Sequence, residues 1–169
     1  LGDYQIAEKL LRRSIILSKE KLGEQHPETA IRMNNLAICL RDKGDFLASE
    51  DLFQKALSIT EKTLGSFHPN TAIRLSNLAS LYNDTGRYQK AEELYRQALK
   101  IEETALGPKH LSVASTLVGL GRTLRNLYTD EVAEPILRQA LAINEQNLIP
   151  DHPKIATSLN NLALSLKFT

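Results

Sequence analysis

Residues 22–27 read Leu-Gly-Glu-Gln-His-Pro, and the same kind of stretch returns every 42 residues, as LGSFHP at 64–69, LGPKHL at 106–111 and LIPDHP at 148–153. Other columns keep this step, among them Ala30, Ala72, Ala114 and Ala156, and Leu36, Leu78, Leu120 and Leu162. A fixed period of this size predicts a solenoid, in which each unit buries its apolar face only against its neighbours. We expect one repeat array over residues 1–169, cut from a longer array, with units of about 1–26, 27–68, 69–110, 111–152 and 153–169.

Each unit is predicted to be a helical hairpin. Leu75, Leu78, Ala79 and Tyr82 stand at i, i+3, i+4 and i+7, the stripe of an amphipathic helix, and Gly86 ends it. A second stripe runs over 88–102 and ends before Gly107 and Pro108. We call the first helix of a hairpin the A helix and the second the B helix. The period then predicts eight helices: A helices near 27–43, 69–85, 111–127 and 153–167, and B helices near 3–22, 45–64, 87–106 and 129–148.

His26, His68 and His152 are predicted to lie just outside an A helix, because the proline that follows each fits best at the first helical position. Four histidines at a regular spacing could suggest a metal site. Successive units of a solenoid are on the order of 10 Å apart, however, so these side chains should not converge on one ion. In the third hairpin, within 111–152, Tyr128 stands where the other hairpins have glycine, and we expect Asp130 to be the N-cap of the helix that follows.

Composition excludes several classes of protein. The longest apolar runs are far shorter than the roughly 20 residues of a membrane span, so no membrane partner is expected. A net charge of +1 argues against nucleic acid as the main partner. The one cysteine, Cys39, suits a reducing compartment, and we expect a cytoplasmic protein. No phosphate-binding loop, metal-ligand cluster or catalytic triad can be recognised, so we expect neither enzymatic activity nor a cofactor.

The pattern Asn77-Leu78-Ala79, Tyr82, Gly86-Arg87-Tyr88 and Ala91 resembles the tetratricopeptide repeat. The ordinary repeat has 34 residues. The 42-residue form, with Leu-Gly-x-x-His-Pro closing a unit and Asn-Leu-Ala in the next, is similar to the repeats of kinesin light chains. The resemblance implies an all-α fold, a right-handed superhelical α-solenoid of helix-turn-helix repeats. It also implies that A helices line a concave groove that binds a partner protein.

On this implied geometry, nine A-helix residues are candidates for the peptide-binding groove: Asn35, Ile38, Arg41, Asn77, Ser80, Asn83, Arg122, Arg125 and Asn161. The A helices carry a net charge of +5, which leaves −4 for the rest of the chain. A basic inner surface would attract segments that contain Asp or Glu. Asparagine amides could bind the main chain of an extended ligand, or Asn35 and Asn77 could instead bond to backbone groups of the neighbouring repeat. Arg122 and Arg125 could contact a ligand or pair with carboxylates of the B helices.

Two functional hypotheses follow. In the first, the chain is a non-enzymatic protein-protein interaction module that holds an extended, acid-containing segment of a partner; likeness to kinesin light chains would make it a cargo adaptor. In the second, the array is a structural or regulatory segment of a larger protein. Both ends of the chain are predicted to expose apolar faces, so we also expect homo-association through these uncapped ends.

Overall fold

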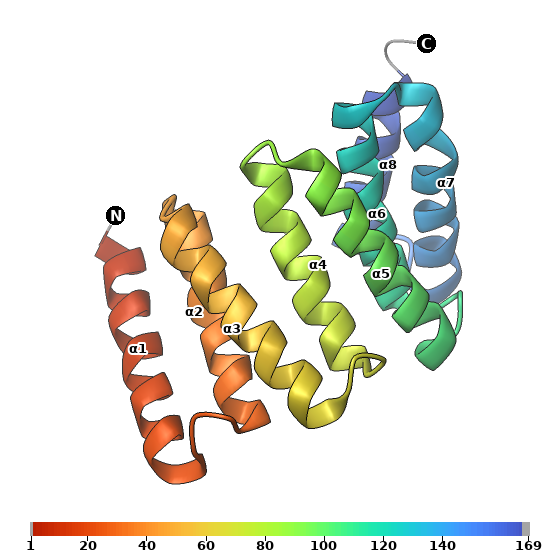
Figure 1. Ribbon diagram of the computed structural model, residues 1–169. Helices are drawn as coiled ribbons and strands as arrows, with labels where there is room; N and C mark the ends of the chain where they lie inside the picture. The colour runs from red at the N-terminus through yellow and green to blue at the C-terminus, as the bar shows by residue number, and fades with distance from the viewer. Residues whose placement is uncertain (1, 167–169) are drawn as a thin grey trace. The chain divides into compact units, whose positions relative to one another are not determined.

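The computed structural model describes residues 2–166, and within them all regular structure is helical (Figure 1). The helices in chain order are α1 (Gly2–Leu22), α2 (Pro27–Lys43), α3 (Phe46–Leu64), α4 (Pro69–Asp84), α5 (Tyr88–Leu106), α6 (Leu111–Leu127), α7 (Asp130–Asn147) and α8 (Pro153–Leu166). Helices α2, α4, α6 and α8 are the A helices, and α1, α3, α5 and α7 are the B helices. The predicted eight helices are confirmed, and each end lies within one residue of its expected position. Lys167, which the charge count includes, lies outside the described residues.

The histidine column marks where A helices begin. In His26, His68, His110 and His152 the ring Nδ1 accepts a hydrogen bond, each of 3.1 Å, from the backbone N–H two residues further on. This satisfies one of the N–H groups that a helix start leaves without an intrahelical partner. The histidine column therefore has a structural role at every repeat: the predicted position just outside the helix is confirmed for His26, His68 and His152, and His110 has the same role.

The first hairpin turns at Gly44, which has φ 91°, a conformation that glycine adopts without steric cost. Asp45 then caps α3 by accepting a hydrogen bond from the N–H of Ala48, at 3.3 Å. The third hairpin differs. Tyr128 ends α6 with φ −127°, and the N-cap of α7 is Thr129, whose side chain makes no capping bond. The expectation that Asp130 is the N-cap is wrong: Asp130 is the first residue of α7, and its carboxylate accepts a hydrogen bond from Arg125 Nε at 3.0 Å instead.

The chain divides into two compact units, residues 1–81 and 82–169, and the division falls inside α4. In the first unit α2 packs between α1 and α3, around a core that includes Ile15, Met33, Leu36, Leu40, Ala56 and Ile59. In the second unit α6 packs against α5 and α7, and α8 contacts both α7 and α6. Buried residues of this unit include Leu117, Leu120, Leu124, Leu137 and Ile143. Among the described residues, no helix is long and apolar enough to cross a membrane.

Candidate peptide-binding surface

The nine predicted groove residues differ in how far the fold exposes them. Asn35 and Arg122 are exposed, and Asn83 and Asn161 are buried. The other five are half-buried: Ile38, Arg41, Asn77, Ser80 and Arg125. Several of them bond to one another or to close neighbours, so each unit is described in turn.

In the first unit the structure brings Arg41 of α2 and Ser80 of α4 together. Arg41 Nη1 lies 3.1 Å from Ser80 Oγ, while Arg41 Nε and Nη2 lie 3.1 and 2.9 Å from Asp42 Oδ1. The guanidinium is therefore held across two successive A helices. Its positive charge is partly balanced by the carboxylate beside it.

The asparagines of the first unit divide between two roles. Asn77 Nδ2 donates a 2.9 Å hydrogen bond to Oδ1 of Asn34, a buried residue on the preceding A helix. This bond links neighbouring repeats through two side chains, whereas the predicted inter-repeat alternative had the amides bond to neighbouring backbone. Asn35, next to Asn34 in the chain, is exposed on α2 and is accessible to a ligand.

In the second unit the two amides of the predicted set bond within the protein. Asn83 Oδ1 accepts a 3.1 Å hydrogen bond from Thr123 Oγ1 of α6. Asn161 Nδ2 donates to the Thr157 carbonyl at 2.8 Å, one turn back in α8. Both asparagines are at least nine-tenths buried. Ligand contact by these two residues remains a prediction, and it would require their present bonds to open.

The two arginines of α6 have different environments. Arg125 pairs with Asp130, the first residue of the following B helix, and both side chains are mostly covered. The guanidinium of Arg122 is about half exposed, and its Nη2 lies 4.0 Å from Asp84 Oδ1, the outer limit for an ion pair. A contact at this distance and exposure contributes little free energy. Arg122 is therefore the more accessible of the two cations.

The groove prediction missed two buried polar residues, which belong to the B helices α5 and α7. Glu102 of α5 is 3% exposed, and burial raises the pKa of its carboxyl, while a hydrogen bond with Thr116 lowers that pKa by less. Asn144 of α7 stands in the same repeat column and is 2% exposed. The signal available in the sequence was the column itself, which holds only polar residues: Ser18, Thr60, Glu102 and Asn144.

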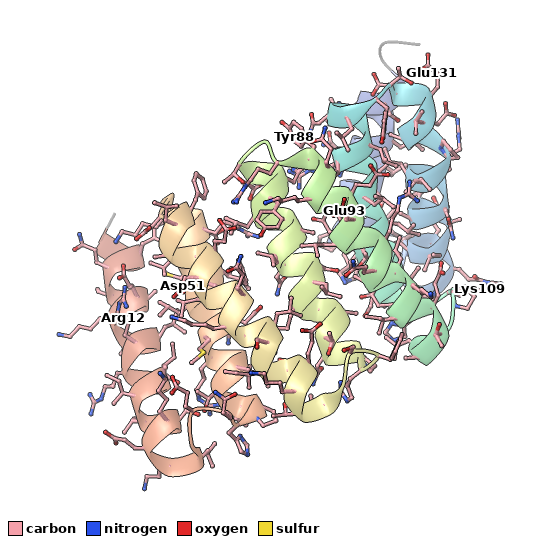
Figure 2. All side chains as sticks on the ribbon, in the orientation of Figure 1. Arg12, Asp51, Tyr88, Glu93, Lys109 and Glu131 are labelled. Atoms are coloured by element: carbon pink, nitrogen blue, oxygen red, sulfur yellow. The ribbon has the colours of Figure 1, made fainter. Side chains whose placement is uncertain are left out.

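A pocket of about 220 Å³ lies in the second unit and is lined from three helices. Its lining residues are Ser115 and Val118 of α6, Asn144 of α7, and Lys154, Thr157 and Ser158 of α8. The B helices present exposed charged side chains, as Figure 2 shows for Arg12 on α1, Asp51 on α3 and Glu93 on α5.

One family model of the tetratricopeptide repeat matches residues 1–59, 33–104 and 75–127, and a second matches 113–154. The chain belongs to the tetratricopeptide repeat family. Domains built of these repeats generally bind other proteins and typically lack catalytic activity. The family assignment expected from the resemblance to tetratricopeptide repeats is thus confirmed.

Solved structures with this fold include proteins related to kinesin light chains. A kinesin-light-chain-like protein of Podosopora anserina with nearly identical TPR-like repeats has 27% identity and a TM-score of 0.78, over 98% of this chain and 79% of that one. BtubC (BKLC) from P. vanneervenii has 25% identity and a TM-score of 0.83, over 98% of this chain and 66% of that one. The Sgt2 TPR domain from Aspergillus fumigatus, at 20% identity and a TM-score of 0.60 over 82% of this chain and 78% of that one, shares the fold. Among curated proteins, none matches significantly.

Proposed function

We propose that this tetratricopeptide array binds an extended, acid-containing segment of a partner protein along its A helices, in the manner of an adaptor. The supporting observation is the exposed guanidinium of Arg122, whose contact with Asp84 is long and weak. An incoming carboxylate could form a shorter, bidentate pair with this group. Asn35 and Ile38 of α2 would add amide and apolar contacts in the first unit. The kinesin-light-chain-like proteins among the structural neighbours support an adaptor role.

A peptide array probed with the chain tests the proposal, followed by charge reversal at Arg122. The variant Arg122→Glu should weaken capture of acidic peptides about tenfold or more, because a favourable charge contact becomes repulsive. Raising the salt concentration should weaken wild-type capture as well. Arg138→Glu is the matched control, since Arg138 is an exposed arginine of the same unit that also pairs with a carboxylate, Glu134. Equal losses in the two variants would contradict a specific role for Arg122.

A second candidate function is self-association, and the apolar faces of α8 and α1 favour it. On α8, Ala156, Leu159 and Ala163 are exposed, although the residues of α6 in the same columns, Ala114, Leu117 and Gly121, are buried. On α1, Leu17 is 47% exposed, whereas Ile59, Ile101 and Ile143 of its column are 5–6% exposed. We infer that these two exposed faces meet between copies of the chain, α1 of one copy packing on α8 of another in a head-to-tail contact.

Sedimentation velocity over a wide concentration range tests this second candidate. Wild-type chain should show concentration-dependent assembly, and Leu159→Glu should abolish it by placing a charge in the apolar contact. Leu47→Glu, which changes an 84% exposed leucine of α3, is the control and should leave assembly unchanged. A strict monomer at all concentrations would reject self-association, but it would not contradict the proposal that the chain binds a peptide.

A further inference from the structure

The pocket between α6 and α8 contains a buried acceptor that the fold leaves unused. Asn144 Nδ2 donates a 2.9 Å hydrogen bond to Ser158 Oγ, but Asn144 Oδ1 has no hydrogen-bond partner among the described residues. Buried polar atoms are nearly always bonded, because an unsatisfied carbonyl oxygen loses the hydrogen bonds that it makes in water. Asn144 also lines the pocket, so a small rotation of its side chain would present this unused oxygen to a ligand as a hydrogen-bond acceptor.

Packing alone does not explain an asparagine in this column. In α1 the column holds Ser18, whose Oγ lies 2.8 Å from Thr29 Oγ1, and in α3 it holds Thr60, which donates to the Ala56 carbonyl at 2.7 Å. Small hydroxyl side chains thus satisfy the same position with their own bonds. Asn144 adds an acceptor beyond the bond to Ser158.

The other polar groups of the pocket define what could enter it. Ser115 Oγ and Thr157 Oγ1 donate to carbonyls one turn back in their own helices, each at 3.1 Å, and Ser115 Oγ also accepts from Lys154 Nζ, so each oxygen keeps a lone pair available to accept. Lys154 Nζ, 3.5 Å from Ser115 Oγ, is the cationic donor in the pocket, and Val118 is an apolar wall. The pocket therefore offers several oxygen acceptors and one charged donor.

We propose that this pocket binds the carboxamide of a glutamine or asparagine side chain. The amide N–H groups of the ligand donate to Asn144 Oδ1 and to a hydroxyl oxygen, and its carbonyl oxygen accepts from Lys154. A carboxylate would place oxygen against Asn144 Oδ1, a cation would be repelled by Lys154, and an apolar side chain would leave Asn144 unsatisfied. The inference rests on the proposed peptide-binding function, since it assigns one side chain of the bound segment.

Nuclear magnetic resonance with small probes tests the pocket without knowledge of the partner. The ¹⁵N-labelled chain is titrated with N-acetyl-glutamine N-methylamide, and separately with the corresponding methionine and glutamate compounds. The probes are used at tens of millimolar, because one side chain supplies little binding free energy. We expect saturable shifts of the backbone signals of Ser115, Val118, Thr157 and Ser158 with the glutamine probe. The affinities of the methionine and glutamate probes should be lower than that of the glutamine probe by a factor of about five or more.

Two variants decide whether Asn144 and Lys154 form the site. Asn144→Ser, which introduces the residue of α1 at this column, should remove the preference for glutamine over methionine. Lys154→Met, at an exposed position, should lower the affinity for the glutamine probe about fivefold and keeps the test open if Asn144→Ser unfolds the chain. Asn160→Ser, at an exposed asparagine of α8 outside the pocket, is the control. An unchanged glutamine preference in Asn144→Ser, or shifts that avoid the four pocket signals, would overturn the proposal.

The outcome can be separated from that of the proposed function. Probe binding without any hit on the peptide array would support the pocket and reject the extended acidic segment. Array hits without probe binding would reject the pocket alone.

Discussion

The hairpins α2–α3 and α6–α7 occupy equivalent positions in the repeat but reach the same fold by different contacts. In α2–α3, Gly44 turns the chain, Asp45 caps α3, and Ser49 Oγ donates to the Ala37 carbonyl at 2.7 Å. In α6–α7 there is no glycine at the turn, the cap lacks a side-chain bond, and Ala133 stands in place of Ser49. An ion pair between Arg125 and Asp130 joins the two helices instead.

The two hairpins also fill their interiors differently. In the first hairpin a fully buried Phe53 accompanies Ala37. The third hairpin has the smaller Leu137 at the column of Phe53, and Gly121 at the column of Ala37. A β-carbon on Gly121 would lie 2.5 Å from Leu137 Cδ2, so the glycine lets α7 approach α6 closely. The comparison shows that a repeat tolerates changes in single columns when partner columns change with them.

Gly119 and Asn35 occupy the same repeat column. Replacing each by alanine should give the largest difference between the two hairpins in the free energy of unfolding. A β-carbon on Gly119 would lie 2.5 Å from the ring of the buried Tyr95, whereas Asn35 is exposed. Gly119→Ala should therefore destabilise the second unit by about 1–3 kcal/mol through overpacking. Asn35→Ala should change the free energy of unfolding by less than about 0.5 kcal/mol. Hydrogen exchange of α6 and α2 amides measures the two effects separately.

A double-mutant cycle with Tyr95→Leu sharpens this prediction. If the ring causes the loss, Gly119→Ala should cost less in the Tyr95→Leu background, because the smaller side chain leaves room for the added methyl group. If the effects of the two substitutions on the free energy of unfolding are strictly additive, the loss in Gly119→Ala does not come from contact with the Tyr95 ring.

Glu102 of α5 and Asn144 of α7 stand in the same repeat column. Only the carboxyl of Glu102 can titrate, so its contribution to stability should depend on pH. The folded-state pKa of Glu102 is raised, so its contribution to stability is complete below about pH 4.5 and is lost as the pH rises through the raised pKa. Glu102→Gln supplies the neutral amide that α7 already has in this column. At pH 8 the variant should be more stable than wild type by on the order of 1 kcal/mol, and the difference should vanish near pH 4. Urea denaturation across this pH range checks the result. Glu93→Gln, at an exposed position of α5, should show no such trend.

The helix boundaries could be predicted because the histidine and glycine columns mark where helices begin and end. The pairing of polar side chains could not. The charge count gives Arg122 and Arg125 equal weight, but only the packed structure shows that Arg125 meets Asp130 while Arg122 stays half exposed. Likewise, the asparagine column does not reveal that Asn77 bonds to Asn34, because such a bond depends on how adjacent repeats are rotated against each other. The repeat spacing determines which helices are neighbours, whereas the hydrogen-bond partners of the side chains depend on rotamers that the spacing does not specify.

The smallest of the predicted differences concerns the two helix caps. Asp45→Ala removes the capping bond to Ala48 and should cost about 1 kcal/mol, while Thr129→Ala should cost less because Thr129 makes no side-chain capping bond. Thr129→Asp would import the cap of the first hairpin into the third and should stabilise α7 by a few tenths of a kcal/mol. Hydrogen exchange at the first turns of α3 and α7 measures these changes. Equal losses of stability from the two alanine variants would mean that Thr129 caps α7 as strongly as Asp45 caps α3. The ion pair between Arg125 and Asp130 would then not be a substitute for a missing cap.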